Sequence, residues 1–277
     1  LRGWAKVKDN VKGEAVSFDK IGKVEMVAKP SRHPDTPNND PNHERRWATV
    51  ASYFANIYLD SDDVQASLSD PTSDYVKALS AAIGRKWDKI ILDAAIGTAT
   101  TGRVGETGAT GTGAVGTETW PYTDAKSVSH RITESGTVGL TVAKVLQTKR
   151  TLDALMVESD RVFVVEAYAV QDLLSEVQPT SADYASIKRL ERGELEGMWA
   201  GFYWVLVDAD LMTVSSSIVS GIAMARGTIG LGIGQDKKIR IGEHPEKSWS
   251  TGIYAEMGGG AVRRDADRIV EVQYYQS

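Results

Sequence analysis

The four histidines are the first residues to test for chemistry, because an imidazole nitrogen can bind zinc or carry a proton near neutral pH. None of them stands three or four residues from another, which is the spacing that brings two rings to one metal ion on a helix. The chain has no cysteine, so thiolate ligands, thiol nucleophiles and disulfides are excluded. We therefore expect neither a zinc site nor a histidine-centred catalytic pair. The histidines are His33, His43, His130 and His244.

Carboxylate and amide oxygens are concentrated in one short stretch, Pro30–His43, and at the residue that follows it. Asp35, Asn39, Asp40 and Glu44 could bind a cation there, but the ligand order and the central glycine of an EF-hand loop are absent. Four of the eight prolines lie in the same stretch, which is typical of an irregular, solvent-exposed tip. The sequence favours a solvated loop over a metal site.

A glycine pattern, Gly111–Gly116, matches the dinucleotide-binding motif G-x-G-x-x-G letter for letter. That motif holds a pyrophosphate only when a strand ends at its first glycine and a helix starts near its last. Here more glycine and threonine precede it, and Trp120-Pro121 follows it. We interpret the match as part of a flexible Gly/Thr-rich loop over Thr98–Thr119. A nucleotide-binding α/β enzyme remains the alternative.

Other catalytic signals are weak. Neither a G-x-S-x-G elbow nor a G-x-x-x-x-G-K-[ST] loop occurs. Asp208 and Asp210 follow an expected buried strand, where active-site carboxylates are often found, but a turn at a sheet edge explains them equally well. Seven tryptophans and ten tyrosines favour interfaces. The sequence therefore indicates interaction rather than catalysis, and it predicts no catalytic, cofactor-binding or metal-binding residue.

One long helix, Asp70–Gly97, is the element expected to position the rest of the chain. Asp70 can cap its first backbone N–H groups, Pro71 suits the first helical position, and Gly97 suits the end. At 1.5 Å per residue this helix spans roughly 40 Å, so other elements should pack along it. Its apolar residues recur every three or four positions. They are Tyr75, Leu79, Ile83, Trp87, Ile90 and Ala94.

The first sixty residues read as an arm followed by a hairpin. Residues 1–12 show no lasting period and are expected to be extended. Gly13–Lys29 and Glu44–Asp60 alternate like strands on either side of the proline-rich tip, which predicts one long hairpin. A two-stranded ribbon is only marginally stable alone. Its aromatic residues must therefore be buried on its own domain or on a neighbouring copy, and both options stay open.

Helix and strand patterns alternate between residues 139 and 225, which indicates a compact α/β or α+β domain. Three strand-like segments then follow a Gly-rich start, with turns expected at His244-Pro245 and Gly258–Gly260. We expect this tail to return to the long helix. The expected helices lie at Val142–Met156, Tyr168–Glu176 and Thr180–Leu195, and the strands at Arg161–Glu166, Gly201–Val207, Ile218–Ala225, Lys237–Ile241, Thr251–Met257 and Arg268–Tyr274.

Composition bounds the class of protein. A chain of 277 residues that is 42% hydrophobic can bury a substantial core. Its net charge of −5 argues against a dedicated nucleic-acid-binding protein, which would carry a basic excess. No apolar run approaches the ~20 residues that span a bilayer, and no signal peptide opens the sequence. We expect a soluble protein without a membrane partner.

Four blocks, in the same order, together resemble the tailed-bacteriophage major capsid proteins. They are DPTSDYVKALSAAIGRKWDKIILDAAIGTA, Leu140–Val157, PTSADYASIKRLERGELEGMWAGFYWV and GLGIGQDKKIRIGEHPEKSWSTGIYAEMGGGAVR. The resemblance implies an α+β protein with the Hong Kong 97-type capsid fold. It divides the chain into an N-terminal arm (1–12), an extended hairpin loop (13–60), a peripheral domain with the long helix and a Gly/Thr-rich insertion (61–135), an axial α/β domain (136–226) and returning peripheral strands (227–277).

The resemblance also implies a function and partners. Copies of the chain would assemble as pentamers and hexamers into the icosahedral head of a tailed double-stranded DNA bacteriophage, in the cytoplasm of the bacterial host. Scaffolding, portal and cement proteins would be further partners, and packaged DNA would contact the inner face weakly. A nanocompartment shell of the same fold, with an enzyme cargo, is a second alternative.

Aromatic and arginine side chains in the arm, hairpin and long helix are the residues we expect at contacts between subunits. They are Trp4, Arg45, Arg46, Trp47, Tyr53, Arg85 and Trp87.

Overall fold

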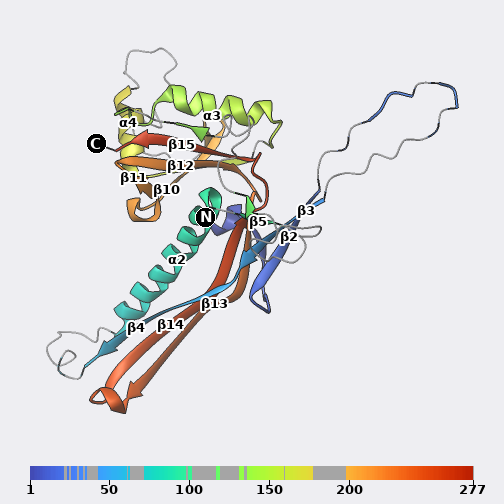
Figure 1. The fold of residues 1–277 in the computed structure, drawn as a ribbon. Helices are drawn as coiled ribbons and strands as arrows, with labels where there is room; N and C mark the ends of the chain where they lie inside the picture. The colour runs from blue at the N-terminus through green and yellow to red at the C-terminus, as the bar shows by residue number, and fades with distance from the viewer. Residues whose placement is uncertain are drawn as a thin grey trace.

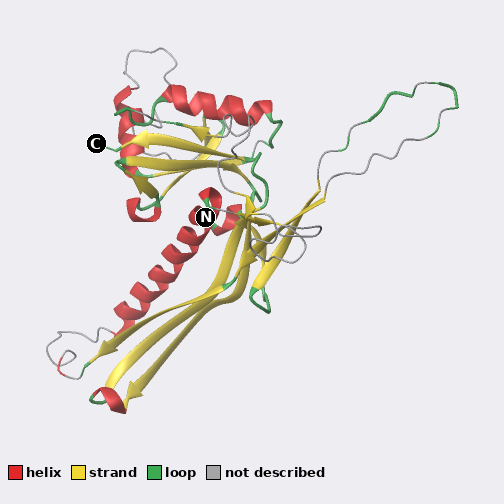
Figure 2. Cartoon of the chain, in the orientation of Figure 1, coloured by secondary structure: helices red, strands yellow, loops and turns green. Residues whose placement is uncertain are grey.

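The computed structural model has two packed regions, and a long hairpin projects from the place where they meet (Figure 1). One region is a four-stranded sheet with a long helix beside it, and the other is a seven-stranded sheet with two helices (Figure 2). The structure describes residues 1–21, 24, 26–29, 31–33, 35, 43–60, 62, 72–97, 99–101, 117–118, 131–133, 136–158, 160–176 and 198–276.

Helix α2 (Thr72–Ile96) confirms the expected long helix. Leu79, Trp87 and Ile90 from its apolar stripe are buried, and the other members of the stripe are half-buried. Asp70 and Pro71, the residues expected to begin the helix, lie outside the described residues.

The four-stranded sheet, called the long sheet below, runs beside α2 (Figure 1). Leu79 of α2 packs against Ile253 and Ala255 of the sheet in a small apolar cluster of its own. A short 3-10 turn, η4 (Pro245–Lys247), lies between its two longest strands. The strand order is β1 (Lys6–Lys8), β13 (Ile229–His244), β14 (Ser250–Arg263) and β4 (Ala51–Leu59).

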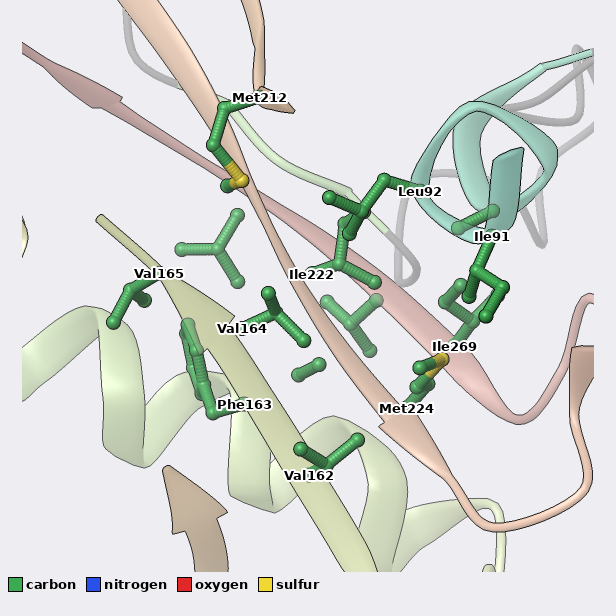
Figure 3. Packing of buried hydrophobic residues seen from close by; sticks show 14 of the residues in the cluster. Ile91, Leu92, Val162, Phe163, Val164, Val165, Met212, Ile222, Met224 and Ile269 are labelled. Atoms are coloured by element: carbon green, nitrogen blue, oxygen red, sulfur yellow. The ribbon is translucent and has the colours of Figure 1, made fainter. Parts of the chain in front are cut away.

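The seven-stranded sheet holds the main core. Strand β8 (Arg161–Val165) is buried along its whole length, because the sheet packs on α3 (Val142–Ala154) and α4 (Ala167–Glu176) as well as on α2. Figure 3 shows Leu92 of α2 beside Ile222 of this sheet and Ile91 of α2 beside Ile269 and Met224. The order is β7 (Arg131–Ile132), β15 (Ile269–Tyr275), β12 (Ile218–Ala225), β8 (Arg161–Val165), β10 (Phe202–Leu206) and β9 (Met198–Trp199), with β11 (Thr213–Ser215) paired to β12 and η3 (Ala209–Leu211) after β10.

The projecting hairpin is formed by β2 (Ala15–Ile21) and β3 (His43–Thr49), which pair antiparallel. Two short strands, β5 (Ala99–Thr101) and β6 (Thr117–Glu118), extend this sheet at its base. The hairpin therefore leaves the molecule from a fixed base, and its tip lies far from both other sheets (Figure 1).

The prediction that Glu44–Asp60 pairs along its whole length with the first hairpin strand is wrong. The chain leaves the hairpin after Thr49, and β4 pairs with β14 instead. The crossing passes over Gly260, where an added Cβ would lie 1.9 Å from the Thr49 carbonyl oxygen. Only glycine leaves room for this change of sheet.

In the N-terminal segment, expected to be extended, η1 (Arg2–Trp4) and β1 pack on the body, and β1 pairs with β13. Two further expectations need correction. The expected turn at Gly258–Gly260 is absent, since β14 continues through it. β15 does not return to the long helix's sheet but pairs with β12.

The helices α3 and α4 and the strands β8, β10 and β12 lie where the sequence predicts them. Thr141 caps α3 by accepting a hydrogen bond from the Lys144 N–H at 3.3 Å. The expected helix Thr180–Leu195 and the glycine motif Gly111–Gly116 lie outside the described residues.

Candidate subunit interface

The base of the hairpin is anchored on glycines of the long sheet. Phe18 lies over Gly230, where an added Cβ would be 2.7 Å from the Phe18 ring, and Val16 lies over Gly232 at 2.3 Å. With Ala48 they form a separate buried cluster. The hairpin's position relative to the body is thus set by contacts within the chain.

Arg46 belongs to this base and does not face outward. It is 2% exposed, and neighbouring positions of a strand point to opposite faces, so Arg45 is the exposed arginine of the pair. Arg45 donates a hydrogen bond to Asp19 across the hairpin, with 2.7 Å between Nε and Oδ1. The guanidinium of Arg46 is enclosed by its own chain, and its expected contact with another subunit stays a prediction.

Arg263 lies near Arg46 and is fully buried. Its Nη1 donates to the carbonyl oxygens of Ala95 and Gly97, both at 2.9 Å, and so satisfies the C-terminal end of α2. Burial, and then the charge of Arg46, lower the pKa of Arg263 to about 10. The two arginines form part of the joint between helix, hairpin and long sheet.

Trp87 is also a core residue. Its ring covers Gly259 of β14, where an added Cβ would lie 2.3 Å from Cη2. Trp87 is thus covered by its own chain, and its expected contact with another subunit stays a prediction.

Two of the expected contact residues surround hollows along α2. Tyr53 is half-buried, with the Lys86 Nζ 4.2 Å from its ring centre. It lines an apolar groove of about 310 Å³ between α2 and the long sheet, together with Phe54, Ala55, Leu79, Ala82, Ile83, Lys86, Ala255 and Met257. Exposed Arg85 lines a second hollow of about 270 Å³ beside η3, together with Ala82, Lys86, Lys89, Asp208, Asp210 and Leu211.

The remaining two expected contact residues are half-buried within the chain. The Trp4 ring centre lies 5.5 Å from that of Tyr203, and the Arg226 guanidinium lies 5.7 Å from the Trp4 ring. Trp47 pairs with Ser17 and Thr100 in the hairpin sheet.

Sequence reasoning missed two exposed apolar groups. Ile21, Val24, Met26 and Val27, called the hairpin tip below, are all more than half exposed, and Met26 is fully exposed. The apolar alternation of these residues is visible in the sequence. The structure adds that, among the described residues, they have no partner strand beyond Ile21.

The second missed group is the turn between β13 and β14. Ser248 and Trp249 both have positive φ, 52° and 59°, and Trp249 is 69% exposed. No sequence pattern marks a tryptophan in a left-handed conformation.

Within the described residues, no helix is both long and apolar enough to cross a bilayer. Their histidine, aspartate and glutamate side chains form no group of three or more that could hold a metal ion.

Comparisons with known proteins agree with this geometry. The capsid of cyanophage P-SCSP1u has a TM-score of 0.65 at 14% identity, over 100% of this chain and 88% of that one. The capsid of Ralstonia phage GP4 has a TM-score of 0.66 at 11% identity, over 99% and 87%. The capsid of a native GTA particle has a TM-score of 0.59 at 12% identity, over 100% and 90%.

A comparison with curated proteins finds no match. The sequence model of the phage capsid protein family matches residues 1–276, which is nearly the whole chain. Because this family model covers nearly the whole chain, the chain belongs to the phage capsid protein family, and the fold that it shares with solved phage capsids is the Hong Kong 97-type capsid fold.

Proposed function

We propose that this protein builds the icosahedral head of a tailed double-stranded DNA phage through a hairpin that each subunit lays across its neighbour. The observation that carries this proposal is the hairpin tip. Its apolar side chains are more than half exposed in their own chain, while the hairpin base is fixed by Phe18 and Val16. The exposed parts of these side chains can be buried only on another molecule.

The same contact repeated from subunit to subunit is heterologous, and heterologous contacts that close generate rings and shells. We therefore propose pentamers and hexamers as the capsomers. Arg45, Trp47, Tyr53, Arg85 and Trp4 stay in the proposed contact set, because their side chains are exposed or half-buried. Individual contacts can be weak, since many act together in one particle.

The family supports further proposals about partners and organisation. We propose scaffolding, portal and cement proteins as partners, weak contact of packaged DNA with the inner face, and assembly in the host cytoplasm. The arm, hairpin-loop, peripheral and axial divisions also stay a proposal. By strand pairing, the peripheral part would consist of α2 with the long sheet, and the axial part would include β15.

Electron microscopy of the purified protein tests the shell, and the variant Met26→Asp tests the hairpin tip. We expect closed particles from the wild type. The variant should fold normally, because Met26 is fully exposed in its own chain, but should yield at least about tenfold fewer particles, since a charge is buried at each contact.

Met156→Asp is the matched control, because Met156 is also almost fully exposed but lies after α3 rather than on the hairpin. A wild-type protein that remains monomeric at every concentration would contradict the shell. Wild-type particle yield from Met26→Asp would leave the shell in place but remove the hairpin tip from its contacts.

A further inference from the structure

Glu166 is a buried acid without a hydrogen-bond partner among the residues that the structure describes. It lies between the end of β8 and the start of α4 and is 1% exposed. Both carboxylate oxygens are buried, and neither accepts a hydrogen bond from the described part of the chain. Glu271, which is almost as buried, instead accepts from Ser220 at 2.7 Å and from Arg131 at 2.8 Å.

The groups that act on Glu166 do not neutralise a negative charge. Asp172 on α4 adds a second carboxylate, and Tyr274 on β15 adds a buried hydroxyl group. Burial raises the pKa of Tyr274, so this side chain stays neutral. An ionised Glu166 would therefore be a desolvated anion beside another anion.

The polar groups between α4 and the start of α3 form hydrogen bonds with residues other than Glu166. Asp172 Oδ2 accepts from the Leu140 N–H at 3.3 Å, and Glu176 Oε2 accepts from the Val142 N–H at 2.6 Å. Lys144 directs its ammonium group at the carbonyl oxygens of Val138 and Gly139, at 3.1 and 3.0 Å. These bonds tie α4 to the start of α3, so movement of α4 would also release α3.

Burial, and then the charge of Asp172, raise the pKa of Glu166 above its usual 4.5. The folded chain thus holds this proton more tightly than the unfolded chain does. The stability that protonated Glu166 contributes is complete below the pKa of the unfolded chain and is lost as pH rises through the raised pKa of the folded chain. The direction is opposite to that of a carboxylate held in a salt bridge.

We propose that Glu166 is a proton-linked latch, which holds α4 against β8 and β15 while its carboxyl group is protonated and loosens α4 when the proton leaves. Because α4 carries the two carboxylates that bind the start of α3, the latch controls the helical cover of the seven-stranded sheet. The proposal concerns the folded subunit and does not depend on the contacts that build a shell.

Hydrogen exchange of the full-length protein tests the latch, with protection factors of α4 peptides measured from pH 4 to 9. In the wild type we expect protection of α4 to fall by up to about tenfold per pH unit above pH 4.5, and then to level off. Glu166→Gln should keep α4 protected throughout. Peptides from α2 provide the internal reference, and Glu243→Gln, an exposed acid, should behave like the wild type.

Asp172→Asn gives a second test that does not depend on the first variant folding. Removal of the neighbouring charge lowers the folded pKa of Glu166 toward 4.5, so the fall in protection should be smaller and should level off at lower pH. A purely structural role would instead lower protection equally at every pH. Wild-type protection of α4 that is independent of pH would overturn the proposal. The same fall in Glu166→Gln as in the wild type would also overturn it.

Discussion

Single residues decide how closely α2 approaches the long sheet, and Gly259 is the clearest case. An added Cβ would lie 2.3 Å from Trp87 Cη2 and 2.8 Å from the Gly232 carbonyl oxygen. The second atom belongs to the backbone of the paired strand and cannot turn aside. We therefore expect Gly259→Ala to lower the free energy of unfolding by roughly 1–3 kcal/mol, as overpacked cores do. Denaturant unfolding of unassembled protein measures this change.

Gly242→Ala is the matched control, because Gly242 lies in the same sheet and an added Cβ there would meet nothing within 4 Å. It should leave stability unchanged or raise it slightly. Equal losses in the two variants would mean that the contact with Trp87 is not what requires glycine.

Predictions about single residues were correct where the neighbouring residues in the sequence determine which way a side chain points. Strand alternation places Arg45 and Arg46 on opposite faces, but it does not say which face turns inward. That depends on Ala99 and Val262, which come from distant parts of the chain and pack against Ala48 on the same buried face as Arg46. The same holds for Trp87, whose partner Gly259 has no local signature.

At the scale of elements, local periodicity predicted α2, α3, α4, β8, β10 and β12 well. Strand pairing was the weak point, because the choice between two sheets is made by long-range contacts. β4 and β15 have ordinary strand patterns, yet each pairs in a different sheet from the one expected. Gly258–Gly260 suggested a turn, whereas those glycines make room for Trp87 and for the chain crossing at Thr49.

Gly84 allows a direct test of α2 as an element. It is exposed in the middle of the helix, and an added Cβ would meet nothing within 4 Å. Gly84→Ala should therefore raise the free energy of unfolding by about 1 kcal/mol through helix propensity alone. The midpoint of thermal unfolding of unassembled protein measures this, and Ala81→Gly, also exposed, should lower it by a similar amount. A destabilised Gly84→Ala would show that the helix needs a bend at this point.

The whole molecule presents exposed apolar groups at two separate ends, the hairpin tip and the β13–β14 turn (Figure 1). The family resemblance predicted the general architecture, since its sequence blocks cover most of the chain. It implied the extended hairpin, but not which of its side chains are exposed nor the exposed tryptophan of the turn, because exposure of a side chain depends on the complete packing of the three sheets. Both ends are surfaces that a subunit can offer to a neighbour without opening its own core.

The β13–β14 turn carries the last prediction. Left-handed backbone costs roughly 1–3 kcal/mol at a residue other than glycine, and here two such residues hold Trp249 out in solvent. A strained turn that exposes a tryptophan is typical of a binding contact. Truncation of a tryptophan at the centre of such a contact often costs about 2 kcal/mol of binding free energy or more. We expect Trp249→Ser to leave the thermal unfolding of unassembled protein unchanged and to raise the protein concentration needed for particle formation at least about tenfold. Ser248→Gly is the control, because it relieves the backbone but keeps the tryptophan, and it should assemble like the wild type. Light scattering across a concentration series measures both variants, and an unchanged threshold for Trp249→Ser would show that this turn faces solvent in the particle as well.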